Sequence, residues 1–210
     1  MKVPEIFRTN LIVVMTSILM FTAGIETKGQ SYRIFKGDTI NRTDQDGKKQ
    51  GMWRRYYEND QLFSETYFKD NIPSSETKTW YRTGEVQAIL TYDATGKTAM
   101  MESFWPDGSP KATGQYINKK KHGRWIYYHR NDSISSIENY NMGVEDGEWT
   151  NYYPSGKVSE RFIYKKGLKH GKYTSYFSNG TKKMETTYSE GTINGPCIHF
   201  YMSGKPMSRG

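Results

Sequence analysis

A repeat of 24 residues constrains this chain more than any other feature of its sequence. Glycines, aromatic rings and turn residues recur at fixed positions of seven successive units, from residue 47 to the end, without an insertion. One column is aromatic in every unit: Tyr56, Trp80, Phe104, Tyr128, Tyr152, Tyr176 and Phe200. Self-similarity at a period of roughly 20 to 50 residues is typical of stacked supersecondary units. The sequence therefore predicts a repeat architecture rather than one central core.

Each unit has the pattern of a β-hairpin, which is clearest in residues 147–164. Aromatic residues stand on both sides of the turn signal Pro154-Ser155-Gly156, and polar and apolar side chains alternate along the flanking segments. A turn column recurs in every unit: Asp60, Gly84, Gly108, Asp132, Gly156, Gly180 and Gly204. We predict an all-β fold, an elongated single-sheet array of about seven antiparallel hairpins, about 65 Å long at the usual strand spacing.

The position of the glycines predicts the register of each hairpin. We expect the first unit to close by pairing Tyr57 with Leu62. Gly51 then lies opposite the closing ring of Phe68, and Trp53 shares that face. A ring over a glycine shields the backbone, and a slip of one residue would scatter the set. We predict that this ring-rich surface is the core face.

Composition agrees with a thin, folded β-protein. Aromatic residues make up 15% of the chain although the mean hydropathy is −0.85, and disordered chains are poor in rings. The single cysteine, Cys197, excludes an internal disulfide. It occupies the column that holds Trp53 in the first unit, so we interpret it as a packing residue rather than a reactive thiol.

The first 29 residues have the pattern of an export signal. Lys2 and Arg8 precede an apolar segment at 11–21, which is shorter than the roughly 20 residues that span a bilayer. Cleavage after Gly24 or after Gly29 fits the small residues that follow, and an uncleaved membrane anchor is the alternative. The sequence predicts an exported protein, either periplasmic, associated with the outer envelope or secreted.

The two ends of the array are irregular. Residues 30–46 match the repeat weakly and predict a degenerate N-terminal capping strand, before an array at 47–210. The last unit stops soon after Gly204 and is expected to lack a second strand. Its strand at 197–202 is then an open edge unless the chain's tail or a second chain pairs with it. We expect such pairing, and a homodimer through this C-terminal edge strand is one form of it.

Two features are candidate binding surfaces. The unbroken aromatic column defined above, here called the ring ladder, is expected to point away from the core face, where it could stack on glycans or grip a peptide. The alternative is that the ladder serves packing alone. The turns that join units carry a candidate basic rim: Lys119, Lys120, Lys121, Lys165, Lys166 and Lys169. Such a rim suits anionic lipid or polysaccharide, or it is a solvated edge that prevents aggregation.

The sequence predicts no enzyme, cofactor or metal site. It has no phosphate-binding loop, nucleophile elbow or zinc-protease motif. His122 and His170 share a column but lie two units apart, roughly 19 Å, which is too far for shared ligation. His129 and His199 occupy strand or ring columns and are interpreted as structural.

The unit G-x-W-x-x-Y-Y-x-x-G, followed by a closing tyrosine and a basic turn, resembles the bacterial variant of the MORN repeat. The residues that carry the resemblance best are 123–140, 147–164 and 171–188, and the register extends it over about 47–204. Units two and three match less well, with Ser75 and Ala99 in the glycine column and Thr77 and Met101 in the Trp column. The resemblance implies an array of hairpins without catalytic residues, used to hold partners or lipid surfaces.

We therefore expect an exported repeat protein that presents an extended aromatic and basic surface to another protein or to the anionic envelope, whether lipid or polysaccharide. Nucleic acid is disfavoured as a partner outside the cytoplasm. Many bacterial members of the family are labelled as the antitoxin of a toxin–antitoxin pair, and this is one alternative, although an export signal is atypical of that role. A structural spacer that assembles through its sheet edges is the other.

Overall fold

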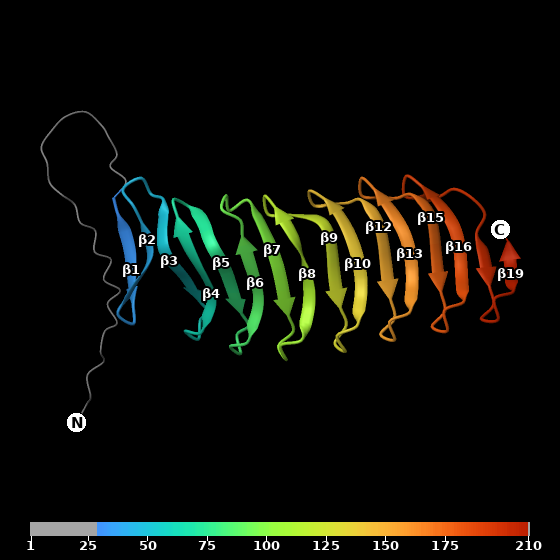
Figure 1. Ribbon diagram of the computed structural model, residues 1–210, viewed down its shortest axis with the longest axis horizontal. Helices are drawn as coiled ribbons and strands as arrows, with labels where there is room; N and C mark the ends of the chain where they lie inside the picture. Colours follow the sequence, from blue (N-terminus) through green and yellow to red (C-terminus); the bar gives the residue numbers. More distant parts are fainter. Residues whose placement is uncertain (1–28, 210) are drawn as a thin grey trace, which may run out of the picture.

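The computed structural model describes residues 29–209, which form nineteen strands of one long, open antiparallel sheet. Within these residues there is no helix, so none is long and apolar enough to cross a membrane. The strands stand side by side in chain order, and the two ends of the described chain lie at opposite ends of the row (Figure 1). The all-β, single-sheet prediction is confirmed. The predicted export signal lies outside the described residues except for Gly29.

The strands before the middle of the chain are β1 (Ser31–Phe35), β2 (Asp38–Thr43), β3 (Lys49–Tyr56), β4 (Leu62–Lys69), β5 (Ile72–Trp80), β6 (Val86–Tyr92), β7 (Thr98–Phe104), β8 (Pro110–Ile117) and β9 (Lys120–Tyr128). The later strands are β10 (Ile134–Asn141), β11 (Val144–Glu145), β12 (Gly147–Tyr152), β13 (Val158–Lys165), β14 (Leu168–Lys169), β15 (Gly171–Tyr176), β16 (Lys182–Ser189), β17 (Thr192–Ile193), β18 (Ile198–Phe200) and β19 (Pro206–Arg209). The short strands β11, β14 and β17 pair with the same neighbours as β12, β15 and β18, so each is the first part of one interrupted strand.

Seven hairpins correspond to the seven predicted units: β3–β4, β5–β6, β7–β8, β9–β10, β12–β13, β15–β16 and β18–β19. Consecutive hairpins also pair with each other, for example β4 with β5 and β8 with β9. Equivalent positions of successive units are therefore neighbours in the sheet.

The predicted register is correct for most of each hairpin but wrong at the turn. Gly51 faces Phe68 as expected, whereas Leu62 pairs with Tyr56 and not with Tyr57. A β-bulge next to the turn causes this difference, and the same shift occurs in all seven hairpins. The Tyr57 amide instead donates to the Gln61 carbonyl at 2.8 Å, so the turn between these two residues is one residue shorter than predicted. The bulge increases the local twist of each hairpin.

Left-handed backbone explains two of the recurring columns. The turn column has φ between 62° at Asp60 and 105° at Gly84, a range that favours glycine and admits aspartate. In the first glycine column, Gly51 has φ 69° and Gly147 has φ 109°. These glycines are required by backbone conformation as well as by the ring that shields them. Shielding alone was the basis of the sequence prediction.

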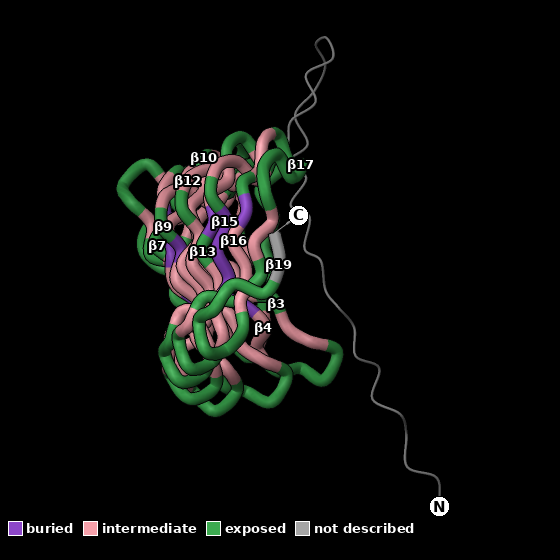
Figure 2. Tube along the Cα trace, turned by 90° about the vertical axis from the view of Figure 1, so that its right-hand side faces the viewer, coloured by how far each residue is buried: buried purple, intermediate pink, exposed green. Residues whose placement is uncertain are grey.

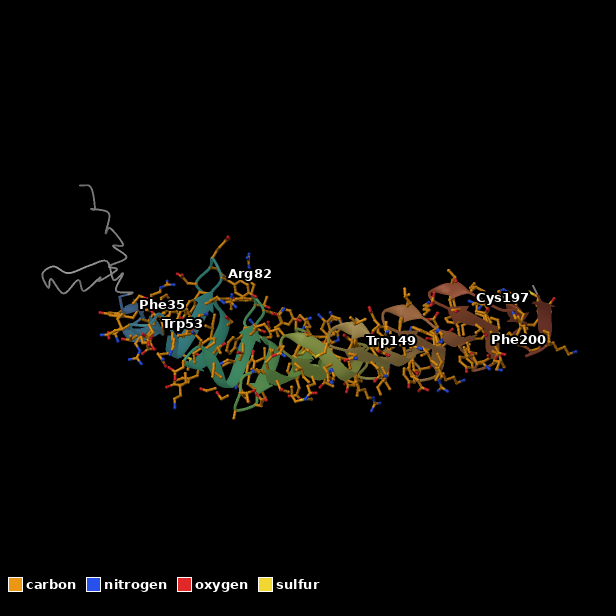
Figure 3. All side chains as sticks on the ribbon, turned by 90° about the horizontal axis from the view of Figure 1, so that it is seen from above. Phe35, Trp53, Arg82, Trp149, Cys197 and Phe200 are labelled. Atoms are coloured by element: carbon orange, nitrogen blue, oxygen red, sulfur yellow. The ribbon has the colours of Figure 1, made fainter. Side chains whose placement is uncertain are left out.

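The single sheet has no second layer of secondary structure among the residues described. Side chains project from both of its surfaces, with Trp53 and Trp149 among them (Figure 3). Buried residues are confined to short stretches along the strands, and the turns at both rims are exposed (Figure 2). Nine of the eleven buried residues lie on the predicted core face: Ser64, Ala99, Ala112, Gly114, Trp125, Phe162, Tyr173, Ser175 and Thr186. The rings on this face are buried by contacts with rings of neighbouring strands on the same face.

Residues 30–46 form a two-stranded hairpin, β1–β2, where the sequence analysis expected one strand. Lys36 and Gly37 have φ of 51° and 89°, which is the geometry of a two-residue hairpin turn. The β2 strand then pairs with β3. The ring of Phe35 lies 4.3 Å from that of Tyr56, so the cap also covers the first rung of the ring ladder.

The expectation that the last unit lacks a second strand is wrong. The chain's tail forms β19, in which Pro206 pairs with Phe200 and Arg209 with Ile198. The turn before it has Gly204 at φ 85°, as in the other units, and strand pairing needs only backbone groups. The strand at 197–202 is therefore covered on both sides, and β19 takes its place as the C-terminal edge.

Candidate binding surfaces

The ring ladder is half-buried along its full length. All seven of its residues have intermediate exposure, and they occupy the last position of a strand just before the bulge. Within residues 29–209 its rings make no close pairs with each other, and only Tyr56 contacts another ring, that of Phe35. Successive rungs lie two strands apart, about 10 Å. The ladder is thus a row of separate platforms rather than a continuous stack.

The column next to the ladder joins one unit to the next. Four of its side chains form a hydrogen bond with the backbone carbonyl of the ladder residue in the following unit. These bonds are Tyr57 to Trp80 (2.7 Å), Tyr81 to Phe104 (2.8 Å), His129 Nε2 with Tyr152 (3.1 Å) and Tyr153 to Tyr176 (2.7 Å). His129 therefore has a structural partner at this position.

Two lysines of the predicted basic rim face inward. Lys121 Nζ lies over the rings of Trp125 and Tyr140, 4.7 Å from the centroid of each. Lys169 Nζ lies 4.9 Å from the centroid of Phe162. These contacts are cation–π interactions, which bind the charge to the core face. The exposed remainder of the rim is Lys119, Lys120, Lys165 and Lys166, none of which forms an ion pair within the described residues.

A polar network lies on the core face beside Lys121. The Tyr140 hydroxyl donates to Glu138 Oε2 at 2.7 Å, and Lys121 Nζ donates to the Tyr127 hydroxyl. Burial, with the Glu138 charge as a second cause, raises the pKa of Tyr127 to about 12. Burial and the same carboxylate also raise the pKa of Tyr140. These hydroxyls are therefore neutral donors at physiological pH.

A hollow interrupts the core face in units two and three. Its volume is about 360 Å³. Its floor and walls are formed by Ala88, Leu90, Ala99, Met101, Tyr92 and Tyr116. Two lysines, Lys97 and Lys119, stand at its edge. Both are exposed, and neither forms an ion pair within residues 29–209.

The hollow exists because the repeat is degenerate here. Met101 stands in the column that Trp125 occupies one unit later, where the indole is only 1% exposed. The smaller side chain leaves the space unfilled. Sequence reasoning noted the weak match of these units but did not predict a cavity. The sequence sign of the hollow is that Thr77 and Met101, which are both smaller than tryptophan, stand in the Trp column of units two and three.

The histidines and the cysteine are dispersed. Cys197 is free and half-buried, with Sγ 3.4 Å from His199 Nε2. His122 is half-buried in β9, and the His170 amide donates to the Ile163 carbonyl at 2.9 Å. In the described part of the chain, no three metal-binding side chains converge.

The geometry defines an open β-hairpin repeat array, a class of protein with an extended surface. The model of the MORN repeat variant family matches the chain at four places, residues 49–70, 121–142, 145–166 and 169–190. The chain therefore contains four copies of the MORN repeat variant, and such repeats are often used in binding. Units two and three, which form the hollow, lie between the matched segments. A search of curated proteins found no match.

Proposed function

We propose that this protein is an exported, non-catalytic binding protein that presents an extended aromatic and basic surface to a partner protein or to the anionic cell envelope. The observation that carries the proposal is the ring ladder, a row of half-exposed rings that make no close pairs with each other along an open sheet. Rings provide a large contact area at a small cost in side-chain entropy.

Charge adds to this surface. The exposed lysines of the rim, Lys119, Lys120, Lys165 and Lys166, lie at two turns of the same rim that are two units apart, with the turn between β10 and β11 between them. Each cation near an anionic membrane contributes about 1 kcal/mol of attraction, which salt screens within about 10 Å. Binding through the rim should therefore weaken as salt is added, whereas binding through the rings should not.

Capture from the envelope fraction of the exporting cell tests the proposal. Replacing Tyr128, Tyr152 and Tyr176 by Ser should abolish capture without unfolding the chain. The matched control replaces Tyr32, Tyr67 and Tyr201, which are 43%, 48% and 52% exposed and lie outside the ladder. Equal capture by both triple variants would contradict a ladder-dependent surface. A toxin partner would be seen as one dominant captured protein.

Export is tested separately by mass spectrometry of the protein recovered outside the cytoplasm. A mature N-terminus at Ile25 or Gln30 corresponds to cleavage after Gly24 or Gly29. An intact N-terminus on a membrane-associated chain corresponds to the anchor. Recovery of the intact chain in the cytoplasm alone would contradict export.

A structural spacer is the second candidate function. Its basis is that β1 pairs only with β2 and β19 only with β18, so both ends of the sheet have an unpaired edge within the described residues. Open edges are templates for pairing with another chain. Assembly through them, including a homodimer, should give a molar mass that rises with concentration in sedimentation equilibrium. A monomer at every concentration would contradict it.

A further inference from the structure

The hollow on the core face is an unoccupied copy of a site that the chain fills itself elsewhere. In unit four the indole of Trp125 lies 4.9 Å from the ring of Tyr116 and under Lys121 Nζ at 4.7 Å. Its Nε1 donates to the Gln115 carbonyl at 3.1 Å. The repeat therefore provides a ring site made of a tyrosine edge, a lysine and a backbone acceptor.

The lysine and the tyrosine of this site recur one unit earlier, without the indole and with Leu90 in the column of Gly114. Lys97 occupies the column of Lys121, and Tyr92 occupies that of Tyr116. Met101 and Leu90 face each other across β6 and β7 where the Trp would stand. The space of about 360 Å³ that remains is lined mostly by apolar side chains, and Lys97 and Lys119 are at its mouth.

We propose that the hollow takes an aromatic side chain, tryptophan above all, from a partner protein, and that a carboxylate next to it in the partner's chain lies between Lys97 and Lys119. This inference rests on the proposed binding function and names the chemistry of the partner. The occupant is an acidic segment with one aromatic anchor. A buried aromatic anchor in a pocket is the usual centre of a protein interface, and the lysines carry the complementary charge.

The test uses the full chain and a short peptide, acetyl-Asp-Trp-Asp-amide, with heteronuclear NMR of the protein as the readout. We expect saturable binding, with shifts confined to residues of the hollow. Replacing the peptide's Trp by Ala should abolish binding. Replacing both Asp by Asn, or Lys97 and Lys119 by Gln in the protein, should weaken it about 2- to 5-fold per charge, as expected for exposed ion pairs.

Met101→Trp is the decisive variant because it restores the Trp of the repeat and fills the hollow from within. Because Leu90 stands in the column of Gly114, which lets the Trp125 indole approach the strand, the variant also carries Leu90→Gly. We expect it to lose peptide binding. Met100→Trp is the matched control, since Met100 is 49% exposed on the opposite face of the same strand. This control should bind as the wild type does. If Met101→Trp does not fold, Ala88→Leu fills the hollow from its other side.

Failure of the wild-type protein to bind the peptide, or binding that survives filling of the hollow, would overturn this inference. Loss of envelope capture on changing the ladder tyrosines tests the broader function separately, because those residues are outside the hollow. Capture without peptide binding refutes only the hollow's role. If the protein binds the peptide but the ladder variant is still captured by the envelope fraction, only the role of the ladder is refuted.

Discussion

At the scale of single residues, Gly114 shows how the ring site of a unit is made. A Cβ at this position would lie 2.3 Å from Trp125 Cδ2, so only glycine lets the indole approach the strand. Gly114 has no left-handed φ. The glycine is therefore required by packing and not by backbone conformation, unlike those of the turn column.

We predict that Gly114→Ala lowers the free energy of unfolding by about 2 kcal/mol, the usual cost of overpacking a close contact. The double variant Gly114→Ala with Trp125→Met should lose less than the sum of the single changes, because the clash disappears with the indole. Urea unfolding measures both. Wild-type stability of Gly114→Ala would show that Trp125 moves freely.

The buried tyrosines make stability depend on alkaline pH. Because folding raises the pKa of Tyr127 from 10.0 to about 12, the folded state holds this proton more tightly than the unfolded state does. Its contribution to stability is fully present below pH 10 and is lost as the pH rises through about 12. We expect the free energy of unfolding to fall over this pH range, and urea unfolding curves recorded at several pH values measure it. Tyr127→Phe should reduce the slope, and an unchanged slope would contradict the assignment.

At the scale of one element, the start of the first strand of a unit depends on a left-handed residue. Gly147 has φ 109° in β12, whereas the equivalent Ser75 in β5 has φ 143°. A side chain in this region costs about 1–3 kcal/mol, which exceeds the roughly 0.5–1 kcal/mol of extra entropy that a glycine loses on folding.

We therefore predict opposite signs for a reciprocal pair of substitutions in this column. Ser75→Gly should stabilise the chain by about 1 kcal/mol, because relief of strain outweighs the entropy cost. Gly147→Ser should destabilise it, since its Cβ would also approach the Cβ of Asn139 to 3.2 Å. Thermal unfolding of the two variants measures both effects. The same sign in both would show that the column is not governed by φ.

At the scale of the whole molecule, stability should vary along the row. In an array each unit contacts only its neighbours, so local contacts set local stability. Ring–ring contacts join units three to six. The pairs are Tyr116–Trp125, Tyr140–Trp149 and Phe162–Tyr173. No ring pair lies wholly between residues 72 and 115, which is the region of the hollow.

We predict that amide hydrogen exchange is faster in β5–β8 than in β9–β16. The internal comparison is between antiparallel strands of one continuous sheet in the same chain. Uniform protection from β3 to β16 would show that the sheet unfolds as one cooperative unit, and the hollow would then not be a weak point.

Much of the fold follows from periodicity. A column spaced by 24 residues can only be buried repeatedly if equivalent positions lie on one face, so the core face and the pairing of Gly51 with Phe68 were predictable. The β-bulge was not predictable from the sequence. It depends on which residue Leu62 pairs with next to the turn, and the alternation of side chains along the rest of the two strands is the same with or without it. The sequence analysis expected the last strand to be paired, by the tail or by a second chain, but did not decide between them, because the tail is short and has no recurring ring; the tail forms that pair.

The binding surfaces divide in the same way. The sequence indicates which residues form the ring ladder and the lysine turns, but exposure depends on neighbours across strands. Lys121 was predicted as rim, yet it lies over the rings of Trp125 and Tyr140, contacts that join positions 4 and 19 residues apart. The hollow likewise arises from missing volume, which a pattern of letters does not measure.

The sequence by itself determined the repeat, the strand pattern, the glycine and turn columns and the face that carries the rings, because each is a local or strictly periodic property of the backbone. Only the tertiary structure decided which lysines are free, where the bulges lie, that the tail closes the last hairpin and that a hollow opens in units two and three. These depend on side-chain volume and contacts between strands, which no single position in the chain encodes.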